Sequence, residues 1–358
     1  MMERQLQHDI RVALIGFGLG GACFHAPLIA VTPGLQLTTI VTSNEARAAE
    51  ARRMYPGINV AASAQWVWDH AAEHDLAVIT TANRVHASLA IAALSVGLPV
   101  VLDKPFARTA AEARQIVQAA EQRQLPVIPY HIRRWDSDFL TLRRLMAEDT
   151  LGRIQRFESR LERWRPHLKG GWRERGAAEE AGGLLYDLGS HLIDQALALF
   201  GPVREVYAEL DSRRAGAETD DDTFLALTHA SGVRAHLWVS VVAAHPAARL
   251  RVLGARGAFV KHAVDPQEAA LRSGHRPIGA DWGTEPPESW GMISDGDRSE
   301  PIPSEPGAYP RFYTQLAAML RGTAPPPVRA QDAVAGLEII EAAQRSAALR
   351  TVVTLGSV

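Results

Sequence analysis

Two stretches of the 358-residue sequence contain side chains that could hold a hydroxyl group and take its proton. Asp103-Lys104-Pro105 offers an ammonium group, and further along the chain Asp187 is followed by His191 and Asp194. The last three lie four and three residues apart, so they share one face if the segment is helical. Histidine titrates near neutral pH, and lysine and histidine can both act as general acid or base. Lys104, Asp187 and His191 are therefore the candidate catalytic residues.

Plainer explanations of these residues stay open. Taken alone, Lys104 is an ordinary exposed residue at a turn, and His191 is a buried histidine capped by Asp187. A metal site is not expected, because the segment has one histidine and no H-E-x-x-H pattern. Cys23 is the only cysteine, which excludes an intramolecular disulfide and a thiolate cage, and a reducing compartment fits.

A glycine-rich turn near the N-terminus indicates a different chemistry. Gly16, Gly18 and Gly21 satisfy G-x-G-x-x-G directly after the apolar run 10–15 and before a helix-compatible segment. In this pattern the first glycine permits a tight turn, the second lets the backbone approach a pyrophosphate, and the third allows close packing of strand and helix. We therefore expect a dinucleotide to contact Gly16, Phe17, Gly18, Leu19 and Gly21. A glycine-rich turn without a ligand is the alternative.

The end of the expected strand 35–41 bears on which dinucleotide binds. NAD-binding units usually place an acidic residue about 20 residues beyond the glycines, where it binds the ribose hydroxyls. This chain has Thr42-Ser43-Asn44 there, followed by Arg47. Hydroxyl groups and a guanidinium suit a 2′-phosphate, which favours NADP bound by Thr42, Ser43 and Arg47. NAD stays open, because Arg47 could be a solvated helix residue and Glu45 could bind the ribose.

Through about residue 130, short apolar runs alternate with helix-compatible segments. Strands are expected at 10–15, 35–41, 76–80, 99–102 and 126–130, with helices at 44–54, 87–96 and 110–124. Such alternation indicates a parallel sheet covered on both faces, an α/β Rossmann domain over residues 1–130. Asp103-Lys104-Pro105 follows one of these strands and so lies at the carboxyl edge of the sheet, where ligands of such folds bind.

From residue 131 onward the pattern changes to that of an α+β domain. Two β-hairpins are expected, with runs at 224–230 and 233–241 and at 250–253 and 258–261. We expect an open, mostly antiparallel sheet with helices on one face, over residues 131–358. Residues 277–310 are rich in Pro, Gly and Ser and are expected to be irregular. A last helix at about 331–347 could pack back on the first domain.

Composition argues against several classes of partner. Hydrophobic residues make up 47% and charged residues 22% of the chain, as in ordinary globular proteins. A net charge of −2 lacks the basic excess of proteins that bind nucleic acid or anionic membranes. The first nine residues are polar, and the longest stretch without Asp, Glu, Lys or Arg is broken by Gly97 and Pro99. We therefore expect a cytoplasmic protein with no nucleic-acid or membrane partner.

Five motifs in this order together resemble the glucose–fructose oxidoreductase and inositol dehydrogenase (Gfo/Idh/MocA) family. They are GFGLGG at 16–21, TTANRVH at 80–86, VVLDKPFA at 100–107, YHIRRWDSDF at 130–139 and GGLLYDLGSHLIDQ at 182–195. Three more resemble its NADP-dependent scyllo-inositol dehydrogenase branch: FHAPLI at 24–29, WRPHLKGGWRE at 164–174 and EAAQRSA at 341–347. The resemblance covers almost the whole chain.

The resemblance implies roles for the residues that match these motifs. Lys104 corresponds to the lysine of the family's Glu-Lys-Pro motif, and Asp187 and His191 to its Asp-x-x-x-His pair. The residues placed near the cofactor are Thr81, Asn83 and His86, and those placed near the substrate are Arg165, Trp172 and Arg173. His131 follows the last strand of the first domain and could reach the same cleft, or be structural. Family members usually carry Glu where this chain has Asp103, so the anchoring of Lys104 could differ here. Homodimers or homotetramers are also implied.

The expected function is that of an NADP-dependent oxidoreductase. It would interconvert a secondary alcohol of a cyclic polyol or sugar with the ketone or lactone by hydride transfer. Lys104 or His191 would take the hydroxyl proton, while Asp187 would fix the substrate and the imidazole. Two alternatives on the same fold stay open: a dinucleotide-dependent glycosidase and a non-catalytic nucleotide-binding regulator.

Overall fold

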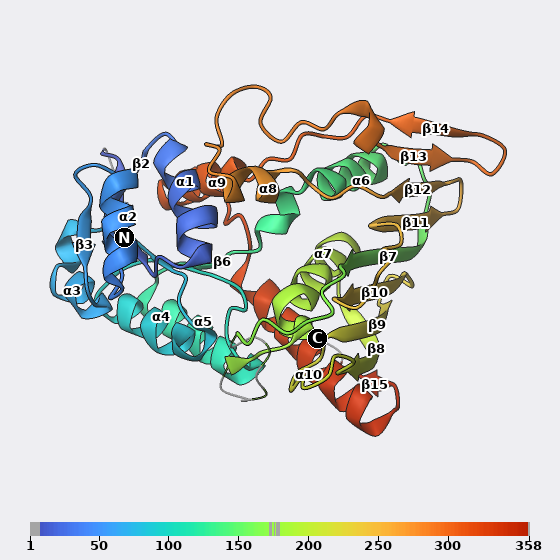
Figure 1. The fold of residues 1–358 in the computed structure, drawn as a ribbon, viewed down its shortest axis with the longest axis horizontal. Helices are drawn as coiled ribbons and strands as arrows, with labels where there is room; N and C mark the ends of the chain where they lie inside the picture. Colours follow the sequence, from blue (N-terminus) through green and yellow to red (C-terminus); the bar gives the residue numbers. More distant parts are fainter. Residues whose placement is uncertain (1–7, 172–173, 175, 177–179, 357–358) are drawn as a thin grey trace.

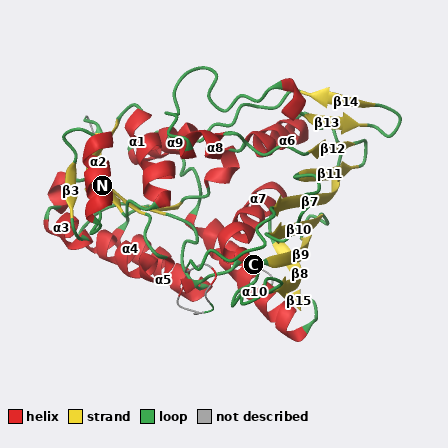
Figure 2. Ribbon diagram, viewed as in Figure 1, coloured by secondary structure: helices red, strands yellow, loops and turns green. Residues whose placement is uncertain are grey.

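The computed structural model describes residues 8–171, 174, 176 and 180–356, and it contains two separate sheets (Figures 1 and 2). The first sheet has six strands in the order β3-β2-β1-β4-β5-β6, and all of its pairings are parallel. Its strands are β1 (Ile10–Ile15), β2 (Leu35–Val41), β3 (Asn59–Ala61), β4 (Leu76–Ile79), β5 (Val100–Leu102) and β6 (Val127–Pro129). The expected Rossmann-like sheet is confirmed.

Helices cover both faces of this sheet (Figure 1). They are α1 (Ala26–Val31), α2 (Glu45–Met54), α3 (Ala64–Asp69), α4 (His86–Ser95) and α5 (Ala110–Arg123). Every residue of β4 and β5 is buried, as a sheet with two covered faces requires. β3 and α3 were not predicted, because elements of three and six residues are too short to show a period.

The second sheet has nine strands in the order β14-β13-β12-β11-β7-β10-β9-β8-β15. All its pairings are antiparallel except that of β7 with β10, so the expected mostly antiparallel sheet is confirmed. The strands are β7 (Ile154–Glu162), β8 (Val203–Asp211), β9 (Asp222–His229), β10 (Arg234–Ser240), β11 (Leu250–Gly254), β12 (Ala258–Lys261), β13 (Gly291–Ser294), β14 (Ser299–Ile302) and β15 (Val353–Thr354). Both expected hairpins are present, as β9–β10 and β11–β12.

The prediction that residues 277–310 are irregular throughout is wrong. Strands β13 and β14 pair within this segment as an antiparallel hairpin at one edge of the sheet. Their sequences, GMIS and SEPI, contain glycine or proline and lack the alternation of a half-buried strand. β14 is exposed except at its last residue, so burial imposes no pattern there.

The remaining helices are α6 (Ser137–Ala147), α7 (Ser190–Phe200), α8 (Gln267–Arg272), α9 (Pro310–Leu320) and α10 (Ala330–Leu349). Of these, α6, α7 and α10 lie on the inner side of the second sheet, whereas α8 and α9 lie beside α1 (Figure 1). α10 contacts both halves. The amide of Ala110 at the start of α5 donates to Glu341 Oε1 (2.8 Å), and the amide of Ala208 in β8 donates to Ser346 Oγ (3.0 Å).

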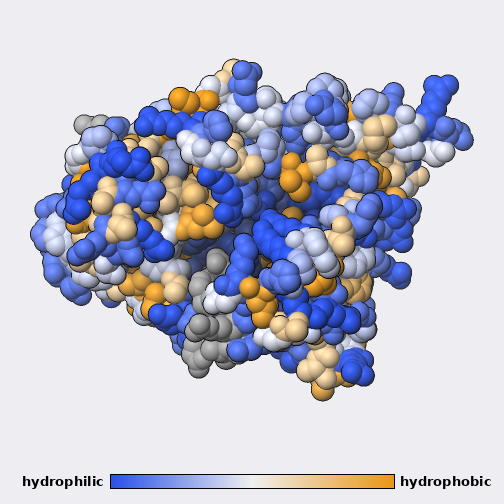
Figure 3. All heavy atoms as spheres, viewed as in Figure 1, coloured by the Kyte–Doolittle hydropathy of each residue, from blue (hydrophilic) through white to orange (hydrophobic). Residues whose placement is uncertain are grey.

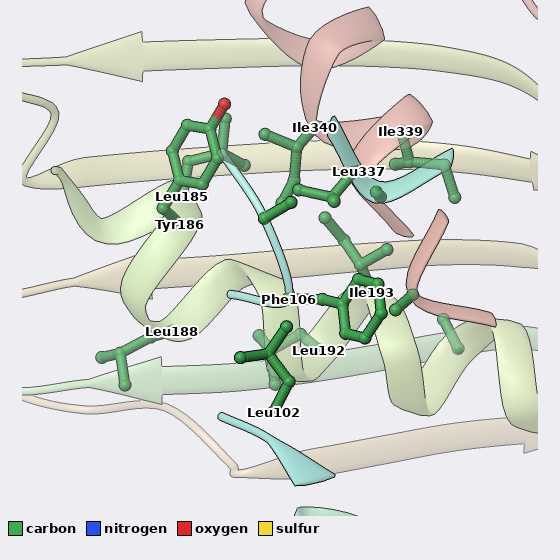
Figure 4. Close-up of a cluster of buried hydrophobic side chains, with 14 of the residues drawn as sticks. Leu102, Phe106, Leu185, Tyr186, Leu188, Leu192, Ile193, Leu337, Ile339 and Ile340 are labelled. Atoms are coloured by element: carbon green, nitrogen blue, oxygen red, sulfur yellow. The ribbon is translucent and has the colours of Figure 1, made fainter. Parts of the chain in front are cut away.

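The apolar core runs from one half of the molecule into the other. Figure 4 shows Leu102 of β5 and Phe106, which follows this strand, near Leu192 and Ile193 of α7, with Leu337 and Ile340 of α10 in the same cluster. A second cluster joins β1 and β4 to Phe312 and Leu316 of α9. The expected domain boundary at residue 130 falls directly after β6, but helices from beyond it complete the core of the first half. Within the described ranges, no helix is both long and apolar enough to cross a membrane.

Candidate active site

Of the three glycines that make up G-x-G-x-x-G after β1, two are crowded and one is open. A Cβ on Gly16, whose φ is +104°, would lie 2.4 Å from the carbonyl oxygen of Thr80, and one on Gly21 would lie 2.2 Å from that of Gly16. A Cβ on Gly18 would meet nothing closer than 3.8 Å, and that atom is Nη1 of Arg47. Gly16 and Gly21 therefore pack the turn, whereas Gly18 leaves a free backbone surface such as a pyrophosphate needs.

The helix after this turn begins with a π-helical turn, Gly20–His25, which leads into α1. Phe17 is buried in the core and Leu19 is half exposed, so only the backbone of Phe17 is offered to a ligand. At the end of β2, Asn44 Oδ1 accepts from the amide of Arg47 (3.0 Å) and caps α2. Thr42 is partly buried, and Ser43 and Arg47 are exposed at this rim. The guanidinium that the sequence analysis assigned to a 2′-phosphate thus lies beside Gly18.

Asp103 anchors the turn that carries Lys104. Its Oδ1 accepts from the amide of Lys104 (2.7 Å), its Oδ2 accepts from Thr80 Oγ1 (3.0 Å), and the Nε2 atom of His25 lies 3.6 Å from Oδ2. Burial raises the pKa of this carboxyl, but the nearby His25 and Lys104 outweigh burial and lower the pKa to about 2. Asp103 is therefore ionised across the working pH range, and the shorter side chain still holds the lysine turn.

Lys104 reaches across to the second half of the chain. Its Nζ donates to the backbone oxygen of Asp187 (2.6 Å) and to Asp187 Oδ1 (2.9 Å). Lys104 follows β5, and Asp187 lies in a second π-helical turn, Leu185–Gly189, which leads into α7. Two of the three candidate catalytic residues therefore meet directly between the two sheets.

His191 lies buried on the first turn of α7. In the part of the chain that the structure describes, its Nδ1 has no hydrogen-bond partner. Burial first, then the charges of Lys104 and Arg133, lower the pKa of His191 well below its usual value, so the ring is neutral at pH 7. Asp187 does not contact Nδ1 of this imidazole in the described part of the chain, and its Oδ1 accepts from Lys104. A role of Asp187 in holding the ring stays a prediction.

Asp194 lies beyond the other two on α7 and has a separate structural partner. Arg134 donates to both of its carboxylate oxygens, at 2.9 and 2.7 Å, and also to Asp332 Oδ2 at 3.0 Å. His131 is buried nearby, with Nε2 3.8 Å from Asp194 Oδ1 and with Nδ1 unpartnered among the described residues. Burial lowers the pKa of His131, so this ring too is neutral. It lies close enough to His191 that a positive charge on it would lower the pKa of His191 further.

The residues expected near the cofactor make different kinds of contact. His86 Nδ1 lies 2.9 Å from the oxygen of Pro105 and Nε2 lies 3.2 Å from the oxygen of Thr81, so its ring holds the lysine turn against the end of β4. Asn83 donates to the oxygen of Glu180 (3.0 Å) in the second half. Thr81 Oγ1 is buried and has no partner within the described ranges, so it is the polar atom here that still needs one.

The substrate residues proposed from the sequence are only partly placed. Arg165 is exposed on the chain that leaves β7, with its amide bonded to the oxygen of Val241 (2.7 Å). Trp172 and Arg173 lie outside the described residues. The sequence analysis missed Arg133 and Arg163, whose charges act on His191 and Asp187. The period of β7 was the available signal for Arg163, because residues 157, 159 and 161 form its inner row.

Figure 3 shows a hollow between the two halves, lined mainly by hydrophilic side chains. Within the described ranges no group of three or more His, Cys, Asp or Glu side chains could hold a metal ion. The site therefore combines an open phosphate-binding turn, an ammonium–carboxylate pair and a neutral imidazole. Such a set can bind a dinucleotide and handle the proton of a hydroxyl group.

Comparison with protein families and with known proteins supports this interpretation. Residues 10–131 match the model of the oxidoreductase family with an NAD-binding Rossmann fold, and residues 139–260 match that of the GFO/IDH/MocA C-terminal domain. The uncharacterized oxidoreductase YdgJ of Escherichia coli (strain K12) is 38% identical over 98% of this chain and 100% of its own length. The chain belongs to the Gfo/Idh/MocA family of oxidoreductases.

Other members of the Gfo/Idh/MocA family are similar over a comparable length. The scyllo-inositol 2-dehydrogenase (NADP(+)) IolW of Bacillus subtilis (strain 168) is 35% identical over 96% of this chain and 95% of its own. The structure of the yvaA protein from Bacillus subtilis matches with a TM-score of 0.93 at 34% identity, covering 99% of this chain and 100% of that one. This chain is thus an oxidoreductase with an NAD-binding Rossmann domain, and its dehydrogenase relatives imply a small-molecule substrate.

Proposed function

We propose that the protein is an NADP-dependent dehydrogenase that interconverts the secondary alcohol of a cyclic polyol or sugar with the corresponding ketone or lactone. The observation that carries the proposal is the contact of Lys104 Nζ with Asp187 at the carboxyl edge of the parallel sheet, next to the glycine turn. Ligands of doubly wound folds bind at this edge. Relatives named for scyllo-inositol and for D-apiose support a polyhydroxylated substrate.

The residues present fit a dinucleotide. Gly18 offers open backbone for the pyrophosphate, and Thr81 Oγ1 is a buried hydroxyl without a partner among the described residues. When bound, the nicotinamide would accept or supply the hydride. Gly16, Gly18 and Gly21 would shape the phosphate site, while His86 and Asn83 would hold the backbone around the cofactor.

The protein's own groups would then handle the hydroxyl proton. His191 is neutral, so during alcohol oxidation its imidazole is able to accept a proton. The ammonium group of Lys104, oriented by Asp187, would donate a hydrogen bond to the same substrate oxygen. In this assignment His191 is the base and Lys104 steadies the charge that develops on the oxygen.

Preference for NADP rests on Arg47. Its guanidinium lies beside Gly18, and the chain has Thr42-Ser43 instead of an acidic residue at the end of β2. A guanidinium forms strong charge-assisted hydrogen bonds with a 2′-phosphate, whereas an acidic side chain would repel that phosphate. The name of IolW includes NADP(+), which agrees with this preference.

We also infer that copies of the chain associate through the outer face of the nine-stranded sheet. In the part of the chain that the structure describes, no helix covers the outer face of this sheet (Figure 1). The outer face carries Phe224 and Trp238 with ring centroids 5.0 Å apart, and Arg160 lies 3.8 Å above the Trp238 ring. Light scattering should give twice or four times the monomer mass, and Trp238→Glu should lower it. A monomeric parent protein would remove this part of the proposal.

The central test is a turnover screen of the purified chain. Inositols, aldoses and their oxidised partners are incubated with NADP or NAD, and the absorbance of reduced nicotinamide is followed. We expect turnover of at least one polyol, a roughly 10²-fold loss in Lys104→Met, and NADPH binding that stays within a few-fold in that variant. Arg47→Ala should weaken NADP binding about tenfold or more and leave NAD binding unchanged.

Two results would contradict the proposal. Cleavage of glycosides without net formation of reduced nicotinamide would support the glycosidase alternative. Saturable NADPH binding with no turnover of any polyol or glycoside would support the regulator.

A further inference from the structure

Arg163 extends the inner row of β7 into the hollow between the two halves. Its amide donates to the oxygen of Ser240 (2.8 Å) and its own oxygen accepts from the amide of Ala243 (3.1 Å), so the backbone stays extended past Glu162. Side chains alternate along an extended chain, which places Arg163 on the face of Phe157 and Leu161, toward α7 and Asp187.

The Arg163 guanidinium is partly buried but has no partner among the residues that the structure describes. Within the described ranges no hydrogen bond or ion pair involves its side chain, although most partly buried arginines here form several. Glu268 is the acid whose charge favours the Arg163 cation most, yet its carboxylate already pairs with Arg133 and with Arg272. Burial, followed by the charges of Arg165 and Arg133, lowers the pKa of Arg163 while leaving it a cation.

Among the described residues, the two acids that act on Arg163, Glu268 and Asp187, already bind other cations. Lys104 is paired with Asp187, and Arg133 with Glu268 and Asp136. Arg163 and Arg165 lie close enough to interact, and neither side chain has a carboxylate partner in the described part of the chain. A partly desolvated, unpaired cation is costly, and a neutral polyol would not offset it. A group with a negative charge would.

We propose that Arg163, together with Arg165, binds an anionic oxygen group of the substrate, a carboxylate or a phosphate carried by the polyol or sugar. This inference rests on the proposed dehydrogenase function and narrows its substrate to acidic polyols. The reacting hydroxyl would lie at Lys104 and His191, and the anionic group would lie toward the end of β7. Guanidinium groups bind carboxylate and phosphate through paired hydrogen bonds. Such bonds would orient the ring of the substrate and strengthen its binding.

The test compares substrates that differ by one charge. The purified full-length protein with NADP is offered glucose and glucuronate, galactose and galacturonate, and glucose 6-phosphate. We expect at least one charged member to have a kcat/KM about tenfold or more above that of its neutral counterpart, and added salt to reduce this ratio. The uronates report a carboxylate and the sugar phosphate reports a phosphate.

Variants assign the effect to this side chain. Arg163→Met should lower the kcat/KM for the charged substrate about 10- to 100-fold. The kcat/KM for the neutral substrate should stay within a few-fold of that of the parent protein. Arg156→Met is the matched control, because Arg156 lies on the opposite face of β7 beside Glu158. In this variant the ratio of kcat/KM for the charged substrate to that for the neutral one should stay as in the parent protein. Arg163→Met should also melt at the same temperature as the parent or higher, because no pairing is lost.

The outcomes separate this inference from the function on which it rests. Turnover of neutral sugars with no preference for acids, or an unchanged ratio in Arg163→Met, overturns the anion site and leaves the dehydrogenase intact. Stabilisation of the NADP-bound protein by uronates but not by aldoses, lost in Arg163→Met, supports the anion site even if nothing is turned over. Absence of both effects overturns it.

Discussion

Lys104 and Asp187 are separated by 83 positions, yet their side chains meet at 2.9 Å. Other residues hold the two turns that carry these side chains. Asp103 and His86 bind the backbone of the Lys104 turn. Asp220 holds the Asp187 turn by accepting from the amide of Leu185 (2.7 Å). The contact orients an ammonium group at the sheet edge without consuming all its donors. At the scale of residues, the site consists of the charged pair Lys104 and Asp187 near the neutral imidazole of His191.

The neutral state of His191 leads to a prediction about pH. Burial and the charges of Lys104 and Arg133 lower the pKa of His191 well below 6.5, so the basic form predominates at neutral pH and is lost only in acid. The kcat/KM for alcohol oxidation should therefore stay level as the pH falls through 6.5 and decline only below it. Measurement between about pH 5 and pH 9 would show this, with His191→Gln as the variant lacking that decline. A decline centred at or above 6.5 would exclude His191 as the base.

Residue types and spacing predicted part of this site. Lys104, Asp187 and His191 could be chosen because lysine after a parallel strand and an acid–histidine pair on a helix are local patterns. The bond from Lys104 to Asp187 could not be foreseen, because the π-helical turn that orients Asp187 leaves no mark in the sequence. That Arg163 has no carboxylate partner in the described part of the chain was equally hidden, since pairing depends on residues far apart in the sequence.

At the scale of elements, different glycines of the β1–turn–α1 unit serve stability and nucleotide binding. Gly21→Ala should destabilise the protein by at least about 2 kcal/mol, because its Cβ would overlap the oxygen of Gly16. Gly18→Ala should fold normally but weaken NADPH binding about tenfold, because its Cβ projects into open space toward the phosphates. Thermal melting and NADPH fluorescence titration measure the two effects. Equal losses of stability in both variants would contradict this division.

Strand and helix prediction succeeded where burial imposed a pattern. Strand β2 and the paired strands β9 and β10 lie where apolar runs or strict alternation marked them, because one or both faces are covered. Strand β8 was missed although it spans nine residues, because only its inner positions Val203, Val206 and Ala208 are buried and a register shift interrupts its alternation.

At the scale of the whole molecule, Arg134 connects three parts of the chain. Arg134 comes soon after β6 in the chain. Its guanidinium donates to both carboxylate oxygens of Asp194 on α7 and to Asp332 at the start of α10. Arg134→Met should lower the free energy of unfolding by about 3–5 kcal/mol, because Asp194 would stay buried without a counter-charge. Arg329→Met should cost at most about 1 kcal/mol, since that arginine is exposed while pairing with Asp332. Chemical denaturation compares them, and similar losses would refute the structural role of Arg134.

Helices α9 and α10 come after all strands of the second sheet except β15, but they complete the core of the first half. A fragment ending near residue 130 would lack Phe312 and Leu316 over β1 and β4, and would lack Ile340 beside Phe106. Its exposed apolar surface would favour aggregation over folding. The nucleotide-binding half is therefore not an independent module, and transplanting it into another protein would require carrying these two C-terminal segments with it.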